Sequence, residues 1–271
     1  MSANDDAGST RKRLRLDDDA ANFVYTGQEN VPDGVICVRV HPSIKVIRAR
    51  AFFRQSRLIG VELHDGIEVI EEEAFSECRS LREILFPPAV RAIKDHAFCN
   101  CSQLETAILN EGLEEIGEGA FRGCSLVRID IPPSVRAIKE GAFGGCYQLA
   151  TAILNDGLEE IGRYAFRGCA LVRIDIPPSV RAIKYHAFGG CRRLTTAILN
   201  DGLEEIGEYA FSGCALVCID IPPSIRVIKY CAFHVVVARG YSHVSRNYYV
   251  ETGHVSIVLY YVRPSSVRIK R

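Results

Sequence analysis

An Ala-Phe pair returns along this chain at a nearly fixed interval, and this repeat restricts the possible fold more than any other feature. Successive phenylalanines of these pairs lie 22 or 23 residues apart. A period of this length is typical of solenoids, in which each repeat buries its apolar face only against its neighbours. The phenylalanines are Phe52, Phe75, Phe98, Phe121, Phe143, Phe166, Phe188, Phe211 and Phe233.

Most repeats also carry a cysteine three residues after the phenylalanine. A structural zinc site needs ligands that converge from closely spaced pairs, whereas these cysteines are distributed one per repeat. A catalytic cysteine needs a lowered pKa and a nearby base, and no repeat differs from the others by supplying one. We therefore expect a small apolar packing role, and we predict no metal site, no cofactor and no catalytic residue. These cysteines are Cys78, Cys101, Cys124, Cys146, Cys169, Cys191 and Cys214.

Apolar residues alternate with variable ones in the second half of each repeat. In one repeat, Leu126 is followed by Ile129 and Ile131, and the positions between them are variable. A spacing of two residues is typical of a strand with one buried face. Each repeat is therefore predicted to contribute one short strand to a common sheet.

The Ala-Phe pair, the cysteine and the strand at fixed offsets closely resemble the BspA-like class of leucine-rich repeats over roughly residues 31 to 233. The resemblance implies an α/β leucine-rich-repeat solenoid with a concave parallel β-sheet and short helical turns on the outer face. It also implies a binding or adhesion module, because family members are generally of this kind and lack known catalysis.

The repeat pattern divides the chain into three expected segments. Residues 1–22 are predicted to be a disordered charged tail, residues 23–233 the solenoid, and residues 234–271 a degenerate repeat or C-terminal cap. Residues 35–43 look like an initial strand without its own Ala-Phe turn.

The charge balance and the apolar runs bear on partners and location. The 33 basic and 33 acidic residues cancel, so no global field attracts nucleic acid, and no nucleic-acid partner is expected. The first residues contain no apolar export segment, and the longest apolar run near the end is too short to insert in a membrane. We therefore expect an intracellular protein, cytoplasmic or nuclear, whose 11 cysteines are mostly reduced.

A short basic cluster lies in the N-terminal tail at Arg11, Lys12, Arg13 and Arg15. It resembles a nuclear-import signal, in which extended basic side chains bind acidic pockets of a carrier. The alternative is a solubilising tail, because three aspartates, at residues 17–19, follow the cluster. The sequence leaves these two interpretations open.

Two further patterns extend over many repeats. The charge seven residues before each phenylalanine alternates in sign, which predicts cross-strand ion pairs along one edge. Residues 112–156 and 157–201 differ at only eight positions, seven of which flank the Ala-Phe turn. These outer positions either drift because nothing contacts them, or are tuned to a partner.

The strand residues that face away from the core are the candidate binding site. Such residues form a continuous surface in a solenoid, and a mixture of charged and apolar side chains is typical of protein interfaces. The alternative is a set of solvated Arg-Asp pairs beside β-forming isoleucines. The candidate residues are Glu83, Ile108, Arg128, Asp130, Ile153, Arg173, Asp175, Ile198 and Asp220.

Together these features predict a non-enzymatic protein–protein interaction scaffold that binds an unknown protein partner through the concave sheet. An exported surface adhesion or recognition module is the first alternative. An enzyme whose cysteines or histidines converge in space is the second.

Overall fold

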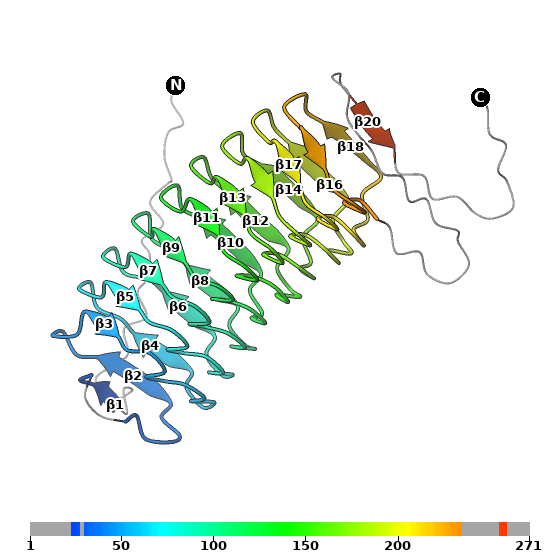
Figure 1. The fold of residues 1–271 in the computed structure, drawn as a ribbon. Coiled ribbons are helices and arrows are strands. Elements are labelled where there is room, and N and C mark those ends of the chain that lie inside the picture. Colours follow the sequence, from blue (N-terminus) through cyan, green and yellow to red (C-terminus); the bar gives the residue numbers. More distant parts are fainter. Residues whose placement is uncertain (1–22, 28–29, 235–254, 259–271) are drawn as a thin grey trace, which may run out of the picture.

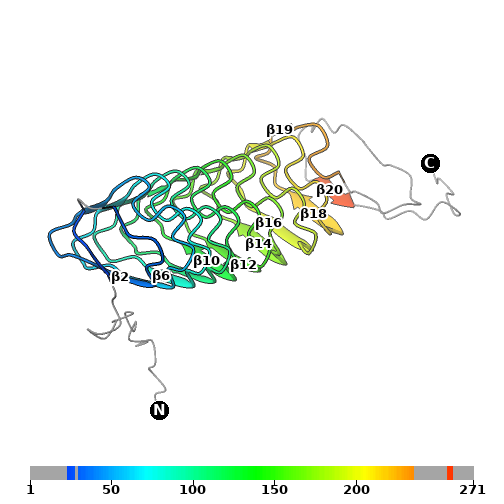
Figure 2. The ribbon, with the colours of Figure 1, turned by 90° about the horizontal axis from the view of Figure 1, so that it is seen from below.

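The computed structural model describes residues 23–27, 30–234 and 255–258. Each repeat forms one rung of a rod, and every rung carries a longer strand, a two-residue strand and the Ala-Phe turn (Figure 1). The longer strands form a row along one side of the rod (Figure 2). Their bounds are β2 (Cys37–Val40), β4 (Gly60–Glu62), β6 (Glu83–Leu85), β8 (Thr106–Ile108), β10 (Arg128–Ile131), β12 (Thr151–Leu154), β14 (Arg173–Ile176), β16 (Thr196–Leu199) and β18 (Cys218–Ile221).

The two-residue strands form a second sheet that the sequence pattern did not predict. This sheet is parallel, has nine strands and runs without interruption along the rod. Its strands are β3 (Val46–Ile47), β5 (Val69–Ile70), β7 (Ala92–Ile93), β9 (Glu115–Ile116), β11 (Ala137–Ile138), β13 (Glu160–Ile161), β15 (Ala182–Ile183), β17 (Glu205–Ile206) and β19 (Val227–Ile228).

The core lies between the two rows of strands and the Ala-Phe turns. Ile129 and Ile131 of β10 are buried, while Arg128 and Asp130, which alternate with them, are exposed, as the prediction requires. The phenylalanine rings stack along the axis of the rod with centroids 4.8 to 5.6 Å apart. Tyr25 of β1 (Phe23–Tyr25) closes the N-terminal end of this stack, 5.0 Å from the ring of Phe52.

The predicted helical turns on the outer face are wrong, and so is the α/β class. The described residues contain no helix and form a parallel β-solenoid. In the turn around Phe98, the amides of His96, Phe98 and Asn100 donate to carbonyls of the next rung at 2.7 Å. The alternate amides, those of Ala97, Cys99 and Cys101, donate to carbonyls of their own turn. A helix needs every amide to bond within the segment, so this alternation excludes one.

Left-handed backbone at two positions of each turn from Phe52 to Phe211 produces this alternation. His96 has φ 55° and Asn100 has φ 59°, two residues before and two residues after Phe98. The turn around Phe121 has Gly119 at φ 55° and Gly123 at φ 71° in the same places. A right-handed helix cannot contain such residues, because they reverse the direction of the amide.

The predicted charge alternation is confirmed as a row of ion pairs beside the two-residue strands. Opposite charges on neighbouring rungs lie 2.6 to 3.4 Å apart. Most of these side chains are largely exposed, and Glu204 is half-buried, so each pair stabilises the fold only slightly and mainly fixes the order of rungs. The pairs are Lys45–Glu68, Arg91–Glu114, Arg136–Glu159, Arg181–Glu204 and Arg226–Glu204.

The described part of the C-terminal segment is His234 and β20 (Val255–Val258). Strand β20 pairs antiparallel with β18, whereas the rungs pair in parallel. The rest of the predicted degenerate repeat or cap lies outside the described residues, as do the predicted disordered tail and the basic cluster at Arg11, Lys12, Arg13 and Arg15. No helix in the described part of the chain is long and apolar enough to cross a membrane.

Candidate functional site

The predicted binding residues all lie on the row of longer strands, which we call the long-strand face. They come from β6, β8, β10, β12, β14, β16 and β18. Backbone hydrogen bonds join these strands in blocks, with β6 paired to β8, β10 to β12, and β14 to β16. The structure therefore gathers the candidates on one surface, and their role in binding stays a prediction.

Two arginine–aspartate pairs dominate this face. In β10, Arg128 Nε lies 2.9 Å from Asp130 Oδ1, and Arg128 Nη2 donates to Asp130 Oδ2 at 3.0 Å. In β14, Arg173 and Asp175 repeat both distances. Each pair is a bidentate fork, which fixes the orientation of the guanidinium. About half of each side chain is exposed, so the forks present oriented polar groups to solvent.

Exposed isoleucines alternate with these forks. Asp130 lies opposite Ile153 in the register of β10 and β12, and Asp175 lies opposite Ile198 in β14 and β16. Ile153 and Ile198 expose 37% and 36% of their surface, although isoleucine is usually buried. Ile108 of β8 is 37% exposed and extends the same pattern toward the N-terminus.

The two ends of the candidate set differ from its centre. Glu83 of β6 is half-buried and lies opposite Thr106 of β8. Asp220 of β18 is exposed and lies opposite Ser256 in the antiparallel pairing with β20. The regular alternation of fork and isoleucine therefore extends from Ile108 of β8 to Ile198 of β16 and does not include Glu83 or Asp220.

The repeated cysteines have a structural role that is more specific than the predicted apolar packing. Each Sγ donates a hydrogen bond to the carbonyl of the phenylalanine one rung earlier, at 3.0 to 3.2 Å. The thiols thus join consecutive turns. Burial raises the pKa of the Cys146 thiol to about 12, and it also raises the pKa of Cys124 and Cys169.

These thiols are expected to resist alkylation in the folded protein. The thiolate is the reactive form, and a pKa raised by burial keeps it scarce at pH 8. We expect iodoacetamide to label the half-buried Cys99 and Cys231 first, and Cys124, Cys146 and Cys169 only at the rate of unfolding. Peptide mapping by mass spectrometry after timed labelling measures this order. Rapid labelling of Cys146 in the folded state would contradict the burial of these cysteines between consecutive turns.

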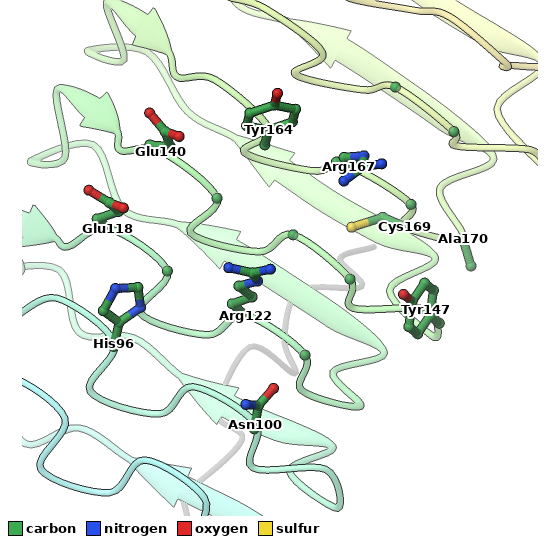
Figure 3. Close-up of a pocket in the computed structure, with 18 of the residues that line it drawn as sticks. His96, Asn100, Glu118, Arg122, Glu140, Tyr147, Tyr164, Arg167, Cys169 and Ala170 are labelled. Atoms are coloured by element: carbon green, nitrogen blue, oxygen red, sulfur yellow. The ribbon is translucent and has the colours of Figure 1, made fainter.

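A groove on the outer side of the turns is a feature that sequence reasoning did not identify as a site. It has a volume of about 990 Å³ and lies over the turns between the rungs of Phe98 and Phe188. Figure 3 shows its floor of turn backbone and the side chains around it. We call it the outer groove. Glu118, Gly119, Glu140, Gly141 and Tyr147 line it, and all five are positions at which the duplicated units differ.

The chain is similar to one protein family and to several solved structures. The family model described as the BspA type leucine-rich repeat region matches residues 37–146 and 114–236, with six copies. A leucine-rich repeat protein from Bacteroides ovatus is 27% identical, with a TM-score of 0.67 over 71% of this chain and 53% of that one. This chain therefore spans about half the length of the Bacteroides protein.

Two other solved structures are similar over comparable lengths. The leucine-rich repeat protein of T. pallidum is 27% identical, with a TM-score of 0.49 over 74% of this chain and 85% of its own. A leucine rich cell surface protein from Faecalibacterium prausnitzii is 22% identical, with a TM-score of 0.47 over 80% and 74%. A search among curated proteins finds no match. The repeat register, the solenoid and the match over most of the chain agree, and the protein belongs to the BspA-type leucine-rich repeat family.

Proposed function

We propose that this protein is a non-enzymatic interaction scaffold that binds another protein through the long-strand face. The family is a repeat scaffold and not a known enzyme class. The observation that carries the proposal is the alternation of bidentate Arg-Asp forks with exposed isoleucines on successive strands, β10 through β16.

This alternation combines two properties that a protein interface needs. The isoleucines supply apolar area that gains free energy when it is covered. The forks are already neutral and oriented, so a partner can accept or donate hydrogen bonds to them without first reorganising two long side chains. Because the pattern repeats every second rung, it also fixes the position of a partner along the rod.

Affinity capture tests this proposal when it is combined with matched variants. The first variant, R128A/D130A/R173A/D175A, removes both forks and leaves the net charge unchanged. The control, E118A/R122A/E140A/R167A, removes the same number of each charge from the outer groove. We expect a captured protein to be identified by mass spectrometry, and its affinity as a purified protein to fall about tenfold or more only in the first variant.

Folding must be equal in both variants, as judged by circular dichroism and melting temperature. If both variants bind the identified partner as well as the wild type, the long-strand face is not the binding site. If only the groove variant loses binding, the partner uses the outer face instead.

An exported surface-recognition module is the second candidate function. It is favoured by one of the similar solved structures, which is described as a leucine rich cell surface protein. Protease treatment of intact cells followed by mass spectrometry separates the two locations. Peptides released from intact cells indicate surface display, and peptides found only after lysis indicate the intracellular location that the sequence predicts.

A further inference from the structure

The outer groove differs from the long-strand face in the state of its arginines. Arg122 and Arg167 follow the phenylalanines of their turns, and Arg192 and Arg193 lie at the end of the groove. All four are exposed, and none forms an ion pair within the part of the chain that the structure describes. On the long-strand face, by contrast, Arg128 and Arg173 are neutralised by aspartates.

The acidic residues of the groove are fewer and lie to one side. Glu118 and Glu140 precede their phenylalanines by three residues, whereas Arg122 and Arg167 follow theirs by one. Figure 3 shows both carboxylates along one edge and both guanidinium groups nearer the middle of the floor. With four arginines against two glutamates, the groove is net positive and complements an anionic partner.

The spacing of the central arginines favours one conformation of that partner. Between the turns of Arg122 and Arg167 lies one further turn, which has Gly144 at the position of the arginine. Arg122 and Arg167 are therefore two rungs apart. The phenylalanine rings of these three rungs step by 5.6 and 5.3 Å. A polyproline II helix rises about 9.3 Å in the three residues that return a side chain to one face. An extended strand returns a side chain to the same face after about 6.8 Å, which matches the two-rung spacing of the arginines less well.

The floor and walls also suit a polyproline II segment. Glycines form much of the floor, and a Cβ added at Gly141 would meet no atom within 4 Å. Tyr147 is 77% exposed at one wall, and its ring lies 3.4 Å from the position of a Cβ on Gly168. Tyr164 lies at another wall, and its ring stacks on His186 with centroids 5.7 Å apart. Grooves lined by aromatic rings are the usual receptors of proline-rich segments.

We propose that the outer groove binds an acidic, proline-rich segment of a partner protein in the polyproline II conformation, with a carboxylate at every third residue. The carboxylates pair with Arg122 and Arg167, and the proline rings lie on the glycine floor between the tyrosines. The site is separate from the long-strand face, so it does not depend on the function proposed for that face.

The probe for this proposal is a fluorescent twelve-residue peptide made of four Glu-Pro-Pro units. Its comparison peptide has the same composition with the four glutamates placed together. We expect saturable binding of the first peptide to the full chain, weaker binding of the second, and a loss of affinity as salt is raised. Fluorescence anisotropy measures all three.

Two variants of this protein copy residues that the repeat already carries at equivalent positions. R122S/R167S introduces the serine that stands at Ser212, and Gly141→His introduces the residue found at His186. We expect the first to weaken peptide binding about tenfold through the loss of two charge pairs. The histidine side chain of Gly141→His is expected to block the groove by its volume, without adding a negative charge that would repel the peptide. The control, R128S/R173S, makes the same charge change two rungs apart on the long-strand face, and should bind like the wild type.

Three results would overturn the proposal: no binding of either peptide, equal binding of both, or equal weakening by R122S/R167S and R128S/R173S. Binding of polygalacturonate but not of the peptide would also overturn it, because the groove would then recognise an anionic polysaccharide. Since the long-strand face is intact in R122S/R167S, failure here leaves the function proposed for that face untouched.

Discussion

Phe166→Ala is expected to destabilise the protein by about 3 to 5 kcal/mol, the usual cost of removing a fully buried phenylalanine side chain. Phe166 is completely buried. Its ring stacks between Phe143 and Phe188, with centroids at 5.3 and 5.4 Å. The substitution therefore leaves a cavity in the middle of a continuous stack, and neither neighbour can fill it because each is held by its own rung. Urea unfolding followed by circular dichroism measures the free energy of unfolding.

Phe233→Ala is the matched control for this prediction. Phe233 occupies the same position of the repeat, but it is only partly buried, and among the described residues its ring stacks on Phe211 alone, at 5.5 Å. We expect a clearly smaller loss of stability. An unchanged unfolding curve for Phe166→Ala would mean that the register of the repeats is wrong.

Much of this architecture could be predicted from the sequence because it repeats. The interval between phenylalanines identified the solenoid, and alternation in the longer strands separated buried Ile129 and Ile131 from exposed Arg128 and Asp130. The same register placed Lys45 beside Glu68. These features depend only on side-chain period and on which residues neighbour each other between rungs, and both can be counted along the chain.

The two-residue strands and the shape of the turns could not be predicted in this way. A strand such as β11 (Ala137–Ile138) is too short to show a period of two residues. The Ala-Phe turn combines apolar residues at helical spacing, yet its backbone is reversed two residues before and after the phenylalanine. Glycine recurs two residues after the phenylalanine at Gly123, Gly145, Gly168, Gly190 and Gly213, and this was the available signal against a helix.

The outer groove was hidden for a different reason. Divergence between the duplicated units marked Glu118, Glu140 and Tyr147, but the sequence left open whether these positions drift or are tuned to a partner. Only the three-dimensional arrangement shows that these positions surround one hollow with Arg122 and Arg167. Whether an arginine is paired with a carboxylate depends on the direction of its side chain, and residue order alone does not give that direction.

Gly202→Ala is expected to destabilise the protein by about 2 to 3 kcal/mol, because it forces an alanine into a conformation that only glycine adopts freely. Gly202 has φ +115°, and a Cβ there would lie 2.1 Å from the carbonyl oxygen of Pro178. The Pro178 backbone belongs to the rung before, so relieving the clash requires the two rungs to separate. Urea unfolding measures this cost under the same conditions as for Phe166→Ala.

Gly112→Ala is a control at the same position of the repeat, and we expect it to have little effect on stability. Gly112 lies outside the left-handed region, and its added Cβ would meet Asn110 Oδ1 at 3.3 Å and Pro88 O at 3.4 Å. An alanine there also restricts the unfolded chain, which by itself stabilises by about 0.4 to 1 kcal/mol. We therefore expect Gly112→Ala to change stability by less than about 1 kcal/mol, since small shifts of its neighbours relieve these contacts. Equal losses of stability in the two variants would contradict this prediction. They would mean that neither the backbone conformation of Gly202 nor its close approach to Pro178 makes glycine necessary there.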